Sequence, residues 1–133
     1  MRIQGTFEVE SQFEPPFFEG DGITMGRAKF TKHFAGDLSA ESTVEFLHAS
    51  VQEKQSGVYV AVERVVGTLL GKRGSFCLHH TGLRDRGAQS LAVHVVPDSG
   101  TGELEGLRGT MTIDIVEGKH YYGFEFTLAS ASA

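Results

Sequence analysis

Apolar and polar residues alternate along most of this chain. In residues 2–10, Ile3, Phe7 and Val9 fall on one side of an extended strand, and polar residues fall on the other. A period of two places successive side chains on opposite faces of a strand, whereas a helix needs a period of about 3.6 residues. No long stretch shows the helical period. The pattern therefore predicts an all-β protein.

Seven further segments show the same alternation, with Gly or Asp in most of the turns between them. They are residues 27–35, 39–50, 58–69, 75–81, 88–96, 110–116 and 121–128. Residues 11–26 contain two prolines and break the alternation, so we expect an irregular Pro- and Phe-containing loop there. A short helical turn is expected near residues 103–107, and residues 129–133 are expected to fray.

Eight strands joined by short turns favour a closed, antiparallel up-and-down β-barrel. Closure removes the exposed edges of the sheet. The interior of an eight-stranded barrel is wide enough either to be filled by side chains or to hold one small ligand. A flattened β-sandwich is the alternative architecture. The sequence shows no linker or internal repeat, so residues 1–133 are expected to form one domain.

Composition and charge exclude several classes of function. The chain has 133 residues and a formal net charge of −5, which argues against a surface that follows nucleic-acid phosphates. Its apolar runs are too short to span a bilayer, so we expect no membrane partner. Cys77 is the single cysteine and cannot form an intramolecular disulfide. Together with the absence of a signal-peptide pattern after Met1, this predicts a cytoplasmic protein.

Lys32 is the most informative polar residue. The alternation places it on the same strand face as Phe30 and Phe34, which is the apolar face. A desolvated ammonium is costly and tends to find a carboxylate or to lose its proton. Lys32 is therefore a candidate ligand anchor or base in a barrel pocket. A structural ion pair, or a stem that extends to the barrel rim, would explain the same pattern.

Glu63 and Arg64 are adjacent on the valine-rich strand and so point to opposite sides of the sheet. Glu63 shares its face with Tyr59 and Ala61, and Arg64 shares its face with the valines. Both faces are largely apolar, so the pattern leaves open which one faces the barrel interior. Glu63, Arg64 and Tyr59 are all candidate ligand-binding residues, and either charged group could pair with Lys32.

The histidines offer one further candidate. His80 shares a strand face with Phe76 and Leu78, where an imidazole could act as acid, base or donor, or could simply be a hydrogen-bonded core residue. Cys77 and His79 lie together on the opposite face and could supply two ligands of a zinc site. A structural zinc site normally takes four ligands, and no further motif supplies the others. We therefore predict no metal site and no cofactor.

Three aromatic residues, Phe13, Phe17 and Phe18, lie on the segment expected to be a loop. Aromatic side chains on a loop need cover. They are candidates for a plug or lid at one barrel mouth, or for an interface between copies of the chain. We expect a homo-oligomer.

Six phrases that run in order over most of the chain resemble an uncharacterised bacterial family of small domains of unknown function. They are GTF at residues 5–7, TKHFAGDL at 31–38, ESTVEFL at 41–47, ERVVGTLLG at 63–71, GSFCLHHTG at 74–82 and VPDSGTGELEGLRG at 96–109. The resemblance implies a barrel similar to that of allene oxide cyclase. It implies no activity, because fold does not determine function.

Three hypotheses about function follow from these observations. The first, which we favour, is binding of a small apolar molecule in the barrel interior. The second is a cofactor-independent isomerase or cyclase that uses one or two polar groups for proton transfer. The third is an oligomeric interaction protein whose barrel is filled. The first two require an open cavity, and the third does not.

Overall fold

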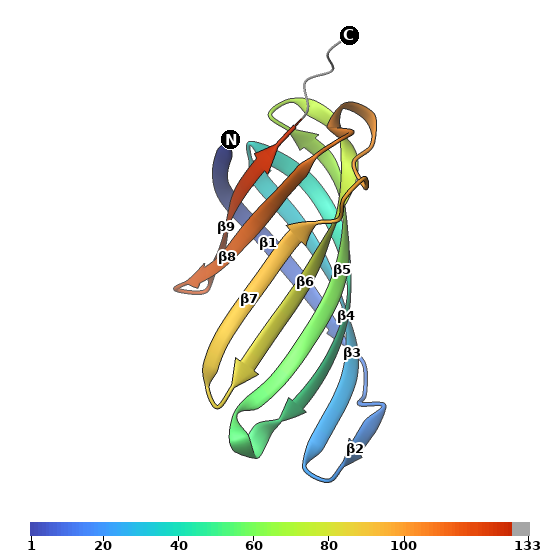
Figure 1. Cartoon of the computed structure of the whole chain (residues 1–133), viewed down its shortest axis with the longest axis vertical. Helices are drawn as coiled ribbons and strands as arrows, with labels where there is room; N and C mark the ends of the chain where they lie inside the picture. The colour runs from blue at the N-terminus through green and yellow to red at the C-terminus, as the bar shows by residue number, and fades with distance from the viewer. Residues whose placement is uncertain (129–133) are drawn as a thin grey trace.

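The chain is built almost entirely from antiparallel strands in the computed structural model, which describes residues 1–128 (Figure 1). The strands are β1 (Arg2–Phe13), β2 (Phe18–Gly20), β3 (Ile23–Gly36), β4 (Leu38–Val51), β5 (Ser56–Leu69), β6 (Lys72–Asp85), β7 (Ala88–Val95), β8 (Arg108–Val116) and β9 (Lys119–Thr127). Two short 3-10 turns, η1 (Gln52–Lys54) and η2 (Gly102–Leu104), lie between strands. No helix in the described part of the chain is long and apolar enough to cross a membrane.

The strands close into an eight-stranded barrel. Each strand pairs with its neighbours in the order β1-β9-β8-β7-β6-β5-β4-β3, and β1 also pairs with β3, which completes the ring. The additional strand β2 pairs with the start of β3, next to the part of β3 that β1 covers. The predicted all-β, up-and-down barrel is therefore confirmed, and the sandwich alternative is wrong.

Four of the hairpins close through two-residue turns that end in glycine. The non-glycine residue of each turn has a φ between 50° and 55°, and the glycine that follows also has a positive φ. Two successive residues with positive φ match the twist of the flanking strands, as in type I′ turns. The turns are Asp21-Gly22, Leu70-Gly71, Arg86-Gly87 and Glu117-Gly118.

The expected loop over residues 11–26 is mostly strand, and that prediction was wrong. Strand β1 continues to Phe13, which pairs with Ala28 of β3, and Phe18–Gly20 forms β2. Pro15 and Pro16 lie in the short connection between the two strands, where the missing N–H of proline breaks no ladder. The expected helical turn near 103–107 is present as η2, and the tail at 129–133 lies outside the described residues.

Apolar side chains fill one end of the barrel. The largest fully buried members of this core include Phe76, Leu78, Tyr122 and Phe124. The segment that contains η2 lies across this end and adds two buried leucines, Leu104 and Leu107. The segment is held to β6 by backbone bonds, among them Thr101 N–H to the carbonyl of Ser75 at 2.8 Å.

Tyr122 closes the same end with a polar contact. Its hydroxyl accepts a hydrogen bond from the N–H of Leu38 at 3.2 Å and lies 3.2 Å from the carbonyl of Ala35. The partner of Tyr122 across the β1–β9 ladder is Gly5, where any Cβ would collide with the tyrosine ring. A glycine is thus required where this aromatic side chain crosses the barrel.

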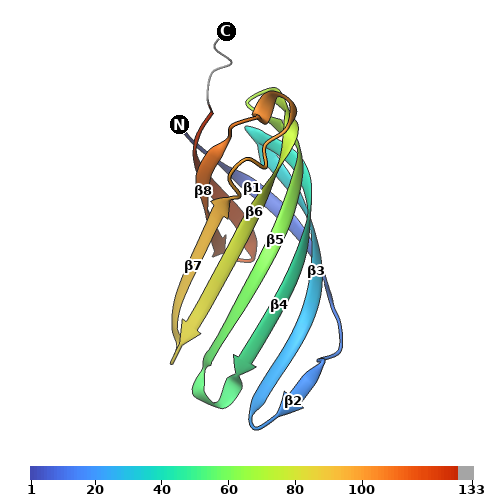
Figure 2. The same cartoon turned by 45° about the vertical axis from the view of Figure 1, so that its right-hand side comes forward.

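The other end of the barrel is hollow. Strands β4 to β7 extend past the turn of the β8–β9 hairpin (Figures 1 and 2). β7 pairs with β8 at only two positions, Val93 with Met111 and His94 with Thr110. The inner faces of the longer strands therefore line an open groove of about 950 Å³ that leads towards the barrel interior.

Candidate functional site

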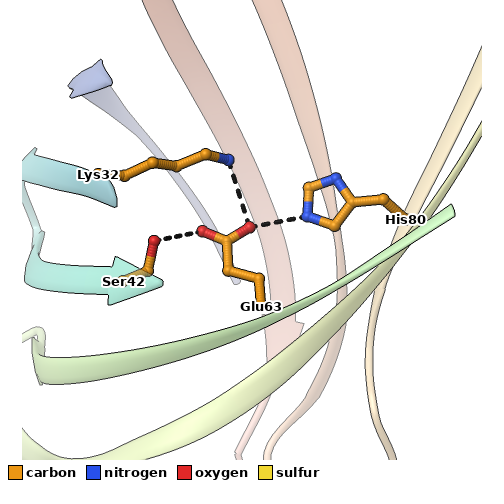
Figure 3. Close-up of polar contacts among 4 residues, drawn as sticks. All are labelled: Lys32, Ser42, Glu63 and His80. Carbon is orange, nitrogen blue, oxygen red and sulfur yellow. Dashed lines mark hydrogen bonds and ion pairs between the residues drawn. The ribbon is translucent and has the colours of Figure 1, made fainter. Parts of the chain in front are cut away.

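Four polar side chains meet inside the barrel, between the filled end and the hollow end. They are Lys32 on β3, Ser42 on β4, Glu63 on β5 and His80 on β6 (Figure 3). All four are buried, with exposed fractions of 1–5%. Charged residues are rarely buried to this degree unless they are paired, and here the other three residues each contact Glu63.

The tilt of the strands explains how residues from four strands reach one level. Lys32 pairs directly with Ser42 across the β3–β4 ladder. On the next two ladders the cluster residues are offset by two positions. Ser42 pairs with Val65, two residues after Glu63. Glu63 pairs with Leu78, two residues before His80. Strands tilt relative to the axis of a closed barrel, so a level row of side chains shifts along each ladder.

Glu63 is the centre of the cluster. Its Oε1 lies 3.2 Å from Lys32 Nζ and 2.7 Å from His80 Nε2, and its Oε2 accepts a hydrogen bond of 2.6 Å from the Ser42 hydroxyl. Both carboxylate oxygens are therefore bonded, as a buried charge requires. The Lys32 ammonium also lies 4.9 Å from the centre of the Phe7 ring, within cation–π distance.

The surroundings of Glu63 keep it ionised. Burial by itself raises the pKa of this carboxyl group. The hydrogen bond with His80, the positive charge of Lys32 and the hydrogen bond from Ser42 together outweigh burial, and the pKa lies below its ordinary value. Tyr59, which lies on the same strand face, has a raised pKa because of its burial and the nearby charge of Glu63. At neutral pH the site therefore holds a carboxylate and a protonated phenol.

The lowered pKa of Glu63 predicts an acid-dependent loss of stability. A carboxyl whose folded-state pKa is below its unfolded value stabilises the fold above that unfolded value, near 4.5, and loses this contribution as the pH falls through the folded value. We expect the difference in unfolding free energy between wild type and Glu63→Gln to shrink steadily as the pH is lowered below 4.5. Urea titrations over a pH series test this, and parallel curves for the two proteins would contradict it.

A cavity of about 270 Å³ begins at this cluster and opens towards the hollow end. Lys32 and His80 form its polar floor. Its walls are mostly apolar and largely aromatic. They come from Phe7, Val9, Phe13, Phe30, Val44, Phe46, Tyr59, Ala61 and Ile113, with Ser11 and His120 as the polar members. Phe46 and Tyr59 stack on each other with their ring centres 4.6 Å apart, and both rings form part of the cavity wall.

The structure places most of the residues singled out from sequence around this cavity. Lys32, His80 and Tyr59 line it, and Glu63 holds the first two from below. Glu63 is the partner of Lys32 that the alternation left open. Arg64 lies on the outer face of the barrel, where its guanidinium is 3.5 Å from the Ser75 hydroxyl. Arg64 is therefore a correction to the list, because it does not reach the cavity.

The three phenylalanines near the N-terminus separate into two groups. Phe13 lies at the cavity mouth, with its ring centre 5.8 Å from Phe30 and 6.5 Å from Phe46. Phe17 and Phe18 lie at β2 and do not line the cavity, although both are exposed. Of these three phenylalanines, only Phe13 lies where it can cover a molecule bound in the cavity.

Sequence reasoning missed several residues of the site. Ser42 occupies the strand face of Val44 and Phe46, and a serine in an apolar alternation is a signal that could have identified it. Phe46, Ile113 and His120 line the cavity but resemble ordinary inward-facing strand residues in the pattern. Their importance depends on which end of the barrel is hollow, and that is a property of the closed structure.

The other histidine and cysteine candidates lie elsewhere. His79 is on the outer face of the barrel and stacks with His94, with ring centres 5.4 Å apart. Cys77 has its backbone N–H bonded to Ser99. Among residues 1–128, no three His, Cys, Asp or Glu side chains lie close enough together to hold a metal ion.

Comparisons with known proteins identify a family. The family described as "Protein of unknown function (DUF3224)" matches residues 3–126. A crystal structure of a DUF3224 protein of unknown function from Shewanella oneidensis MR-1 is 43% identical in sequence, and the match covers 98% of each chain with a TM-score of 0.91. No match is found among curated proteins. The chain therefore belongs to the DUF3224 family, and its resemblance to a family of unknown function is confirmed.

Proposed function

We propose that this protein binds a small, mostly apolar molecule in the hollow end of the barrel. The observation that carries the proposal is the cavity of about 270 Å³, with aromatic walls and a floor of buried charge. Protein interiors are close-packed, and a domain that needed only stability would fill this space with side chains, as the other end is filled. Few pockets form in a small protein, and apolar walls with a few convergent polar groups are typical of ligand sites.

The floor favours a ligand with a hydrogen-bond acceptor at one end. An ammonium has three N–H donors, and Lys32 uses one of them in its side-chain hydrogen bond to Glu63. A carbonyl or hydroxyl oxygen that enters from the mouth would accept a further hydrogen bond from Lys32. The apolar remainder of the ligand would lie against the Phe46 and Tyr59 rings, where each buried CH₂ contributes about 0.8 kcal/mol.

Blocking the cavity from within is expected to abolish binding. Ala61 is buried and lines the cavity, so Ala61→Phe places a ring in the space that the ligand would occupy. We expect it to weaken binding of the apolar dye N-phenylnaphthylamine at least about tenfold, since steric exclusion removes most of the apolar contact. Dye fluorescence measures this. Native mass spectrometry of the purified wild type, followed by denaturing extraction, tests for a molecule that co-purifies.

Val62 provides the matched control. It is the next residue of β5, points out of the barrel and is 58% exposed. Val62→Phe adds an aromatic ring to the same strand without entering the cavity, so dye binding should remain unchanged. The proposal fails if wild type neither binds the dye nor carries an extractable molecule. It also fails if both variants bind the dye as wild type does.

A further inference from the structure

We propose that the floor of the cavity is a proton-transfer site for apolar ketones, in which His80 moves the proton and Lys32 stabilises the enolate. The inference rests on the proposed function, because the ketone must first occupy the cavity. It goes further by assigning a substrate class and a role to each polar group.

Glu63 determines which nitrogen of His80 meets a ligand. An ionised carboxylate only accepts hydrogen bonds, so His80 Nε2, 2.7 Å from Oε1, carries a hydrogen. In the neutral ring Nδ1 is then an acceptor. Nδ1 has no hydrogen-bond partner within residues 1–128. Every fully buried side-chain nitrogen or oxygen in that range has a partner, so Nδ1 is not fully buried. Because His80 lines the cavity, Nδ1 is open to that space and can receive a proton from a bound molecule.

Lys32 is placed to stabilise negative charge beside that base. Its Nζ and His80 Nε2 contact the same oxygen of Glu63, so the ammonium and the imidazole are neighbours at the cavity floor. A fixed ammonium in a site shielded from water stabilises an oxyanion far better than it would in water. Lys32 and Glu63 begin as a neutral pair, and a protonated His80 with an enolate adds a second neutral pair. The step therefore leaves no net charge buried, which is the condition for a desolvated site.

The proposed step conserves all atoms and electrons. His80 Nδ1 takes a proton from the carbon that lies between the carbonyl and a double bond, and the C–H electron pair becomes the C=C bond of an enolate. The carbonyl oxygen takes the negative charge and accepts a hydrogen bond from Lys32. The protonated His80 then returns its proton to the far carbon of the original double bond. The carbonyl re-forms, the double bond becomes conjugated, and no cofactor is consumed.

The walls select which ketones can react. The cavity walls carry several aromatic rings, among them Phe46 and Tyr59, and therefore suit a ketone with an aromatic group. With its aromatic group against these walls, the ketone would place its carbonyl oxygen at Lys32 and its acidic C–H at His80. Holding the reacting atoms together is a large part of what a site of this kind can contribute.

The experiment uses allyl phenyl ketone as the probe. Its isomerisation to the conjugated propenyl phenyl ketone changes the ultraviolet absorbance and is followed with and without the protein. Displacement of N-phenylnaphthylamine by the same ketone measures binding on the same samples. We expect wild type to bind the ketone and to accelerate its isomerisation over buffer.

Variants of two neighbouring histidines separate the base from the fold. His80→Gln keeps an N–H for Glu63 but has no base, and we expect it to slow isomerisation about a hundredfold or more. His79→Gln changes the adjacent, outward-facing histidine of the same strand and should leave the rate unchanged. If His80→Gln does not fold, Glu63→Gln carries the test, because its amide keeps the size of the carboxylate and an oxygen that can accept a hydrogen bond from His80; circular dichroism first establishes that this less stable variant is folded. Because Glu63 positions His80, Glu63→Gln should lower kcat at least about tenfold and leave the affinity for the dye unchanged.

Each contrary outcome identifies what is wrong. A wild type that binds the ketone without accelerating its reaction overturns proton transfer and leaves the proposed function standing. A wild type that binds the dye but not the ketone overturns the substrate class. One that binds neither, and carries no extractable molecule, overturns the proposed function itself. Full activity in His80→Gln, or loss of activity only in His120→Gln, would show that His80 is not the base.

Discussion

Replacing Glu63 with leucine is expected to lower the free energy of unfolding by about 3–5 kcal/mol, because it leaves the buried Lys32 without a counter-charge. Lys32 and Glu63 side chains are 6% and 0% exposed, so water can replace the lost carboxylate only in small part. His80 and Ser42 lose their partner in the same variant. The protein has no tryptophan, so urea unfolding is best followed by far-ultraviolet circular dichroism.

A compensating variant shows whether unpaired charge is the cause. Lys32→Met combined with Glu63→Leu removes both charges and keeps similar volumes. Replacing a buried ion pair by apolar residues is often neutral or stabilising, so the double variant should regain most of the stability that the single variant loses. A double variant as unstable as Glu63→Leu alone would mean that the charges are not what limits stability. Regained stability without ligand binding would mark the pair as functional rather than structural.

Phe124→Ala is expected to cost a similar amount, about 3–5 kcal/mol, for a different reason. Phe124 is fully buried at the filled end of the barrel, with its ring stacked 5.8 Å from Phe76 and 5.0 Å from Phe126. Truncation removes apolar contact and leaves a void that close-packed neighbours fill only partly. The same urea unfolding measurement gives the loss.

Phe124→Ala also tests the division of the barrel into two ends. Because Phe124 does not line the cavity, dye affinity measured below the unfolding transition should stay within about twofold of wild type, as expected for sites without shared contacts. The exposed Val62→Ala serves as the stability control and should change the unfolding free energy by less than about 0.5 kcal/mol. A Phe124→Ala protein that is stable, or that loses dye binding while folded, would contradict this description.

The fold could be predicted from sequence because the hydrophobic alternation is local. The residue types on each face of a strand indicate whether that face is buried, and X-Gly turns such as Leu70-Gly71 mark where the chain reverses in a hairpin. The prediction failed at residues 11–26, where the prolines suggested a loop. Pairing with β3 extends β1 to Phe13 regardless, since a long partner strand can support residues whose own pattern is weak.

The site could be predicted only in part. A lysine among phenylalanines, as at Lys32, is visible in a single strand. Its partner is not, because Glu63 and Arg64 lie on opposite faces and only closure of the barrel decides that Glu63 faces inwards. The same holds for Ser42 and His120, which become important only because one end of the barrel is left unfilled. Long-range geometry of this kind has no signature at any one position.

The two-residue contact between β7 and β8 has a consequence for the solvation of the main chain. Beyond Val93 and His94, the edge of β7 that faces away from β6 has no neighbouring strand within residues 1–128. Peptide groups without a strand partner must be hydrated, so this margin of the barrel is wetted along residues 88–92. Separating the two strands further would break only the bonds at that one contact. The barrel wall is thus continuously hydrogen-bonded around most of its circumference, and the β7–β8 contact is where its strands separate most easily.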